Sequence, residues 1–166
     1  MGVLFQRLDA RMAMVDAAYQ WVDLDPFGSP IQFLDAALQS LSHPDGGWLI
    51  THLGDKDGGV YKLGLNGDLV PFLLEVYGEL LPPTNYVHID NLGRVWVTVS
   101  TRLIPRILGC KPNFKDGFII LIDEEKPRIV AENLGFTNEC LIHPITGDLY
   151  VNETFSRCLS KFNVSS

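Results

Sequence analysis

The chain has 166 residues, a mass of 18.5 kDa and a formal net charge of −7. Apolar residues make up 46% of the sequence and charged residues 20%, which excludes a disordered or low-complexity chain. The acidic balance disfavours a nucleic-acid partner, because phosphate contacts need clustered lysines and arginines. No apolar run approaches the roughly 20 residues that span a bilayer. We therefore expect a globular chain of one domain, or parts of two, that does not enter a membrane.

The number and spacing of the cysteines and the charges near the N-terminus predict the compartment in which the protein occurs. There are three cysteines, an odd number, and none of them has CxxC spacing. This pattern predicts neither a zinc site nor a full set of disulfides. Charged side chains within residues 1–21 interrupt any signal-peptide core. Together these features predict a reduced, cytoplasmic protein.

The first fifty residues predict a strand, a turn and a helix. A β-prone run at 19–25 ends in a turn, after which Ser29 and Gln32 form a capping box at the start of a helix. A second strand is predicted at 48–51, and the two strands would complete a βαβ unit if they are parallel. We assign residues 1–45 to a strand–turn–helix extension. The helix presents one apolar stripe, formed by Ile31, Leu34, Leu38 and Leu41.

Residues 46–166 have an all-β pattern. Short apolar strands alternate with turns rich in Gly, Pro, Asn and Asp. The stretch Val70–Leu80 is the one candidate for a helix, although it contains Pro71 and Gly78. Four hairpins are predicted, which pair residues 59–63 with 68–72, 86–89 with 94–99, 117–122 with 128–132, and 140–142 with 148–151.

The second half of the chain repeats itself. A Thr-Asn pair, an apolar strand and a glycine turn occur at Thr84-Asn85 and again 53 residues later at Thr137-Asn138. A period of about 50 residues with about four strands is typical of propeller blades. We therefore predict a mainly β fold, a partial β-propeller of two to three blades, in residues 46–166. An open arc of blades exposes sheet edges, which would allow self-association.

Residues 46–164 resemble the regucalcin and gluconolactonase family of six-bladed propellers. The residues that carry the resemblance are Gly46–Gly54, Gly58–Leu63, Pro83–Val97 and Phe136–Thr154. The resemblance implies a divalent metal, often calcium, at the mouth of a central channel, which would activate water or polarise a lactone carbonyl. Asn138 matches the mid-blade asparagine that holds this metal, and Asn85 matches a channel-facing asparagine that contacts the small-molecule substrate or a metal-bound water.

Residues 20–51 are similar to a different family. The segment Val22–Ala37, which contains Asp25-Pro-Phe-Gly, resembles the catalytic segment of tRNA guanine-N2 dimethyltransferases. By this resemblance Asp25 would accept hydrogen bonds from the guanine amine, the carbonyl of Pro26 would orient that amine, and Phe27 would stack on the base. The cofactor implied is S-adenosylmethionine.

Three hypotheses of function follow. The leading one is a metal-dependent hydrolase of a small lactone or ester, with Asn138 and Asn85 at its site. The second is a tRNA guanine-N2 methyltransferase-related segment with Asp25, Pro26 and Phe27. The third is a non-catalytic binding module. The first hypothesis requires a cluster of oxygen ligands around the two asparagines, because calcium binds oxygen ligands.

Overall fold

The computed structural model describes residues 47–53, 57–64 and 67–164. The chain divides into two compact units. One unit consists of Met1–Trp48 with Leu63–Asp68, and the other of Leu49–Lys62 with Leu69–Ser166. The predicted strand–turn–helix extension of residues 1–45 lies outside the described residues.

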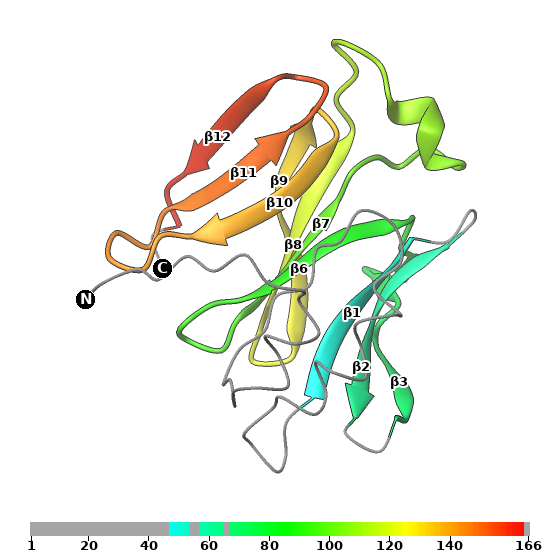
Figure 1. The fold of residues 1–166 in the computed structure, drawn as a ribbon, viewed down its shortest axis with the longest axis vertical. Coiled ribbons are helices and arrows are strands. Elements are labelled where there is room, and N and C mark those ends of the chain that lie inside the picture. Colours follow the sequence, from blue (N-terminus) through cyan, green and yellow to red (C-terminus); the bar gives the residue numbers. More distant parts are fainter. Residues whose placement is uncertain (1–46, 54–56, 65–66, 165–166) are drawn as a thin grey trace, which may run out of the picture. The chain divides into compact units, whose positions relative to one another are not determined.

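The described part of the chain is built almost entirely of β-strands, which Figure 1 colours along the sequence. One short 3-10 helix, η1 (Arg106–Gly109), lies in the long loop between the seventh and eighth strands. The fold is therefore mainly β, as the sequence predicts. The strands are β1 (Gly47–Leu53), β2 (Gly58–Gly64), β3 (Leu69–Leu73), β4 (Glu75–Val76), β5 (Glu79–Leu80), β6 (Thr84–Ile89), β7 (Val95–Val99), β8 (Gly117–Asp123), β9 (Lys126–Leu134), β10 (Thr137–Ile142), β11 (Leu149–Glu153) and β12 (Cys158–Phe162).

The strands form open sheets in which sequence neighbours pair. The orders are β1-β2-β3, β4-β5, β6-β7-β8-β9 and β10-β11-β12. Strands β6 to β9 pair antiparallel throughout, with Val97 opposite both Val87 and Ile120. All four predicted hairpins are confirmed, because β2 pairs with β3, β6 with β7, β8 with β9 and β10 with β11.

The candidate helix at Val70–Leu80 is instead three short strands. Tyr77 and Gly78 both have positive φ, at 55° and 80°, and they form the turn that joins β4 to β5. Two consecutive residues with positive φ suit a tight hairpin turn and break a right-handed helix. Glycine at position 78 makes this turn accessible at low cost.

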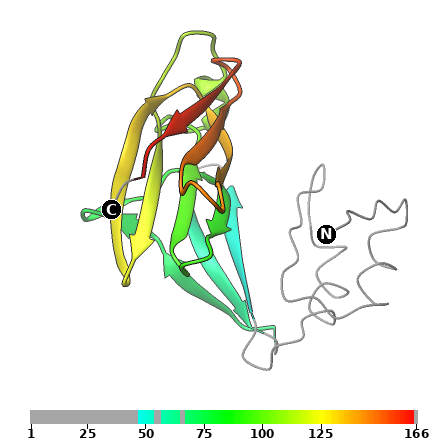
Figure 2. The ribbon, with the colours of Figure 1, turned by 90° about the vertical axis from the view of Figure 1, so that its left-hand side faces the viewer.

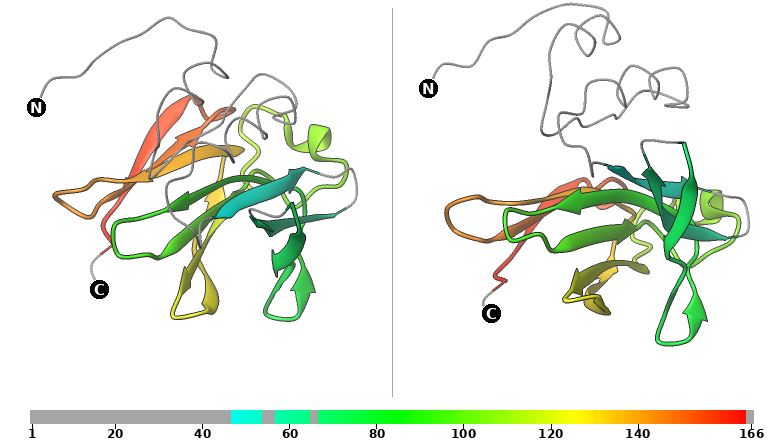
Figure 3. Two further views of the ribbon diagram at one scale, coloured as in Figure 1. Left: turned by 60° about the horizontal axis from the view of Figure 1, so that its bottom comes forward. Right: turned by 90° about the horizontal axis from the view of Figure 1, so that it is seen from below.

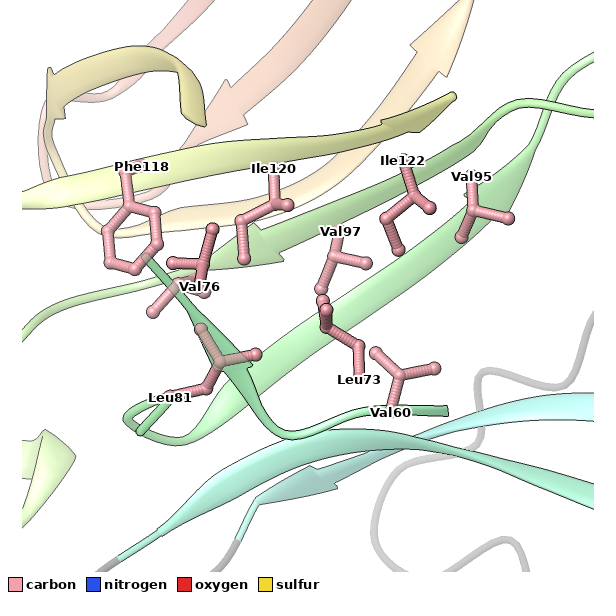
Figure 4. Close-up of a cluster of buried hydrophobic side chains, with 10 residues drawn as sticks. Val60, Leu73, Val76, Leu81, Val95, Val97, Phe118, Ile120 and Ile122 are labelled. Atoms are coloured by element: carbon pink, nitrogen blue, oxygen red, sulfur yellow. The ribbon is translucent and has the colours of Figure 1, made fainter. Parts of the chain in front are cut away.

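The four-stranded sheet has an apolar core on each of its faces. On one face Val95, Val97, Phe118, Ile120 and Ile122 pack against Val60, Leu73, Val76 and Leu81 from β2, β3, β4 and the segment after β5 (Figure 4). On the other face Trp96, Ile119 and Leu121 pack against Cys140, Leu149 and Val151 from β10 and β11. Strands β7 and β8 are buried on both faces, which explains why β7 reads as a continuous apolar run with one threonine.

The repeated threonines join one sheet to the next. The hydroxyl of Thr84 donates to the carbonyl of Gly59 at 2.7 Å, and the hydroxyl of Thr137 donates to the carbonyl of Val99 at 2.8 Å. In both cases the first strand of a sheet is bonded to the second strand of a three- or four-stranded sheet earlier in the chain, and both threonines are 0% exposed. The same hydrogen bond therefore recurs at successive sheets, and Figure 3 shows the β6–β7 and β10–β11 hairpins lying alongside each other.

Candidate functional site

The two asparagines of the repeat meet in the structure. The side-chain amide of Asn85, at the start of β6, donates to the side-chain oxygen of Asn138, at the start of β10. The same amide also donates to the carbonyl of Thr137 at 3.1 Å. The two asparagines that sequence analysis placed at one site are therefore in contact with each other. Both side chains are half-buried.

The asparagine pair does not resemble a cation site. The side-chain oxygen of Asn138, which would have to hold the metal, already accepts a hydrogen bond from Asn85. Within residues 47–164, as far as they are described, no group of three or more His, Cys, Asp or Glu side chains lies close enough to hold a metal ion. A hard cation such as calcium needs six to eight oxygen ligands, several of them carboxylates. The geometry indicates a structural bond between sheets instead.

A hollow of about 370 Å³, with polar and apolar groups in similar measure, has Asn138 of this pair in its lining. It is lined by Asn138, Glu139, Asn152 and Arg157, together with the ends of β11 and β12. The amide of Asn152 donates to the Glu139 carboxylate at 3.0 Å. Arg157 lies in the turn between β11 and β12 and has a positive φ of 54°. The hollow thus offers amide, carboxylate and guanidinium groups to a polar ligand.

Glu153 is a buried carboxylate in the lining of that hollow, and sequence analysis did not identify it. It is 4% exposed, and it accepts hydrogen bonds from the Gly135 amide at 2.6 Å and from the Ser160 hydroxyl. Burial alone would raise the pKa of Glu153, but these hydrogen bonds and the charge of Lys115 lower it below its usual value. The strand register shows that Glu153 lies opposite Thr137 as Val99 lies opposite Thr84, but the 53-residue repeat in the sequence places Asn152, not Glu153, at the position of Val99.

Asp90 is a second buried carboxylate, at the turn between β6 and β7. It accepts hydrogen bonds from the Trp96 indole at 2.9 Å, from the Arg94 guanidinium at 2.7 Å, and from the backbone amides of Leu92 and Arg94. Burial alone would raise the pKa of Asp90, but these donors lower it below its usual value. The cluster fixes the turn and holds Trp96 in the core, so its role is structural.

A wider groove of about 590 Å³ lies between the β4–β5 hairpin and the four-stranded sheet. Its apolar lining comes mainly from the hairpin, Phe118 and Ile129. Arg102 lies over the Phe118 ring at 4.1 Å and forms an ion pair with Glu132 at 2.5 Å. The hydroxyl of Tyr77 accepts a hydrogen bond from the Ile129 amide, which attaches the hairpin to β9. Polar and apolar groups line the groove in similar measure, and two of its charged residues, Arg102 and Glu132, are paired with each other.

The three residues of the methyltransferase resemblance, Asp25, Pro26 and Phe27, lie outside the described residues. The structure therefore gives no geometry for them. Comparison with known proteins does bear on the segment that contains them.

A family model for N2,N2-dimethylguanosine tRNA methyltransferase matches residues 2–55. The tRNA (guanine(26)-N(2))-dimethyltransferase of Haloarcula marismortui is 50% identical to this chain over 38 residues. That alignment covers 23% of this chain and 10% of the archaeal enzyme, so the chain matches only about a tenth of its relative's length. The predicted resemblance to these methyltransferases is confirmed for the N-terminal segment.

The prediction of a regucalcin-like, calcium-dependent hydrolase is wrong. The similarity found is to a tRNA methyltransferase. The described residues contain no cluster of metal-binding side chains, and the Asn138 oxygen is used in a bond between two sheets. Turn-forming asparagines and glycine hairpins are shared by many repeated β folds, which explains why they pointed to the wrong family.

One further expectation concerns the membrane. Across the residues that the structure describes, no helix has the length and apolar character to cross a bilayer.

Proposed function

We propose that residues 2–55 are a guanine-recognition segment related to the tRNA guanine-N2 methyltransferases. The observation that carries this proposal is the family match over these residues, with half of the positions identical across the 38-residue alignment to the archaeal enzyme. The segment Asp25-Pro-Phe-Gly falls inside the matched range. Its chemistry suits an exocyclic amine, because a carboxylate and a backbone carbonyl both accept hydrogen bonds and an aromatic ring stacks on a base.

In this proposal Asp25 and the Pro26 carbonyl accept the two N2 hydrogens of guanine, and Phe27 stacks on the ring. Such contacts orient the amine and tolerate the positive charge that develops when it is alkylated. The substrate would be a guanine of tRNA, and position 26 is the one named for the archaeal relative.

The described residues do not fit S-adenosylmethionine, the cofactor that the proposed family implies. Their regular structure is antiparallel strands and one four-residue 3-10 helix. A glycine-rich loop between a parallel strand and a helix, which is the usual cradle for such cofactors, does not occur among them. We therefore derive no methyl-transfer step from these residues, and the cofactor would have to be held elsewhere.

We also propose that residues 57–164 form successive blades of a partial β-propeller, which serves as a non-catalytic binding module. The recurring threonine bonds at Thr84 and Thr137 support this, because they join neighbouring sheets in the same way. The matched segment runs through residue 55 and includes β1, which joins the β1-β2-β3 sheet. The two parts would therefore share a strand.

The test of the guanine-recognition proposal compares two tRNAs that differ by one amino group. The full chain is titrated with an unmodified tRNA that has guanine at position 26, and with the same tRNA that has inosine there. Inosine lacks only the N2 amine. A hydrogen bond to a charged group is worth about 1.5–3 kcal/mol, so we expect binding to inosine tRNA to be at least about tenfold weaker.

Two variants assign the effect to its residue. Asp25→Asn should reduce the discrimination between guanine and inosine, because the charge of the acceptor is lost while the Pro26 carbonyl still accepts from the amine. The matched control Asp23→Asn, two residues earlier, should retain the discrimination in full. Equal binding of both tRNAs by the unmodified chain would contradict the proposed guanine contact.

A further inference from the structure

The sheet β10-β11-β12 has one face that the described structure leaves exposed. Its inner face carries Leu149 and Val151, which are 1% and 0% exposed in the core. The opposite face, here called the outer face, consists of Glu139, Leu141, Tyr150, Asn152, Leu159 and Lys161, which point away from that core by strand alternation. Leu141 and Leu159 are 55% and 62% exposed. The three strands are labelled in Figure 1.

The corresponding face of the preceding sheet is covered. In the four-stranded sheet Trp96 lies opposite Leu121, and in the last sheet Tyr150 lies opposite Lys161 at the same register. Trp96 and Leu121 are buried against β10 and β11. The outer face is thus equivalent to the face of the four-stranded sheet that β10 and β11 cover. Figure 2 shows these sheets coloured from green to red along the chain. This repetition suggests a β-sheet as its partner.

The charges on the outer face are arranged so that the face complements itself. One row across the strands is Leu141, Tyr150 and Lys161. The neighbouring row is Glu139, Asn152 and Leu159, in which Asn152 pairs with Leu159 and bonds to Glu139. The two leucines therefore occupy one diagonal of the face, and the glutamate and lysine occupy the other.

Consider two copies of the chain related by a two-fold axis that runs along the leucine diagonal of the outer face. Each leucine then meets the same leucine of the other copy, and each Glu139 meets the partner's Lys161. Such an arrangement is isologous, since the same patch contributes to both sides of the contact. Tyr150, at the middle of one row, would supply an aromatic surface of the kind enriched at interfaces.

We propose that the outer face binds the outer face of a second copy of this chain, in a two-fold dimer whose axis passes through Leu141 and Leu159. Two reciprocal ion pairs between Glu139 and Lys161 flank these leucines. Lys161 also pairs with Asp148 of its own chain at 2.8 Å, and its side chain is 55% exposed, so it can contact both carboxylates. This proposal does not depend on the proposed function.

The size of the face sets the strength of the dimer. Three strands about 4.8 Å apart and five residues long give a footprint of about 14 by 17 Å. The resulting area of about 240 Å² is small beside the roughly 800 Å² that each partner buries in a standard interface. We therefore expect weak, reversible association that appears only at high protein concentration, rather than a permanent dimer.

The experiment is a charge exchange read by analytical ultracentrifugation of the full chain at rising concentration. Glu139→Lys and Lys161→Glu should each weaken self-association by about tenfold, because each places like charges opposite each other. A one-to-one mixture of the two variants should recover association as a mixed dimer, since every contact then pairs opposite charges. The matched controls Glu124→Lys and Lys111→Glu reverse exposed charges away from the face and should leave association unchanged.

Two outcomes would overturn the proposal. One is a chain that stays monomeric throughout the concentration range. The other is a dimer that tolerates both reversals, which would place the contact elsewhere, for example at the open sheet edges. Since Lys161→Glu also breaks the pair with Asp148, thermal melts should accompany the measurement. The variant Leu159→Asn, which changes no charge, should weaken association in the same way if the reversal variant does not fold.

Discussion

The hydroxyl of Thr137 should contribute measurably to the stability of the β-sheets. It is 0% exposed and donates at 2.8 Å to the carbonyl of Val99, which lies 38 residues earlier in the preceding sheet. The variant Thr137→Val replaces this hydroxyl by a methyl group of similar size. It leaves little cavity, so the main cost is a buried carbonyl without its partner.

That cost can be estimated from the structure. A buried group that loses its hydrogen-bond partner costs about 1–3 kcal/mol. For a domain of roughly 100 residues, each kcal/mol lowers the melting temperature by about 4 °C. We therefore expect Thr137→Val to melt about 4–12 °C below the unmodified chain.

The assay is urea and thermal unfolding followed by circular dichroism. Thr154→Val is the matched control, because the Thr154 side chain is exposed and its loss should change the free energy of unfolding by less than about 0.5 kcal/mol. Thr84→Val should cost more than Thr137→Val, since the Thr84 hydroxyl both donates to the Gly59 carbonyl and accepts from the Gly59 amide. If Thr137→Val unfolds like Thr154→Val, the repeated threonines do not hold the sheets together.

Two further predictions concern buried ionisable groups. Burial, with a smaller effect from the neighbouring Glu139 charge, raises the pKa of the Cys140 thiol to about 12. Alkylation at about pH 8 should therefore label the exposed Cys158 and spare Cys140 until urea unfolds the chain. Equally fast labelling of both cysteines, measured by mass spectrometry, would contradict the burial of Cys140 in the core. The pKa of Asp90 is lowered in the folded state, so its contribution to stability is present above its ordinary pKa of 3.8 and is lost as the pH falls through the lower folded value. Asp90→Asn should therefore reduce the free energy of unfolding by about 2–3 kcal/mol at neutral pH and by clearly less at pH values well below 3.8. A reduction in the free energy of unfolding that is the same at every pH would contradict the role given to the ionised Asp90 carboxylate.

Local pattern alone predicted the hairpins. Strand β7, for example, follows a turn at Gly93, where φ is 78°, and its apolar run could only be a short buried strand. The N-terminal relationship was equally readable, because the Asp25-Pro-Phe-Gly segment is specific enough to be recognised without structure. Both kinds of signal are contained within a few consecutive residues.

Only the tertiary structure decided what the repeated Thr-Asn pairs do. Their partners lie 25 to 53 residues away, in a neighbouring sheet, and no local pattern specifies which oxygen or amide will face them. The sequence suggested that Asn138 holds a metal, but folding places the amide of Asn85 against that oxygen, and the burial of Glu153 was likewise invisible. Sequence fixes the strands because backbone preference is local, whereas the partner of a polar side chain depends on how the sheets pack.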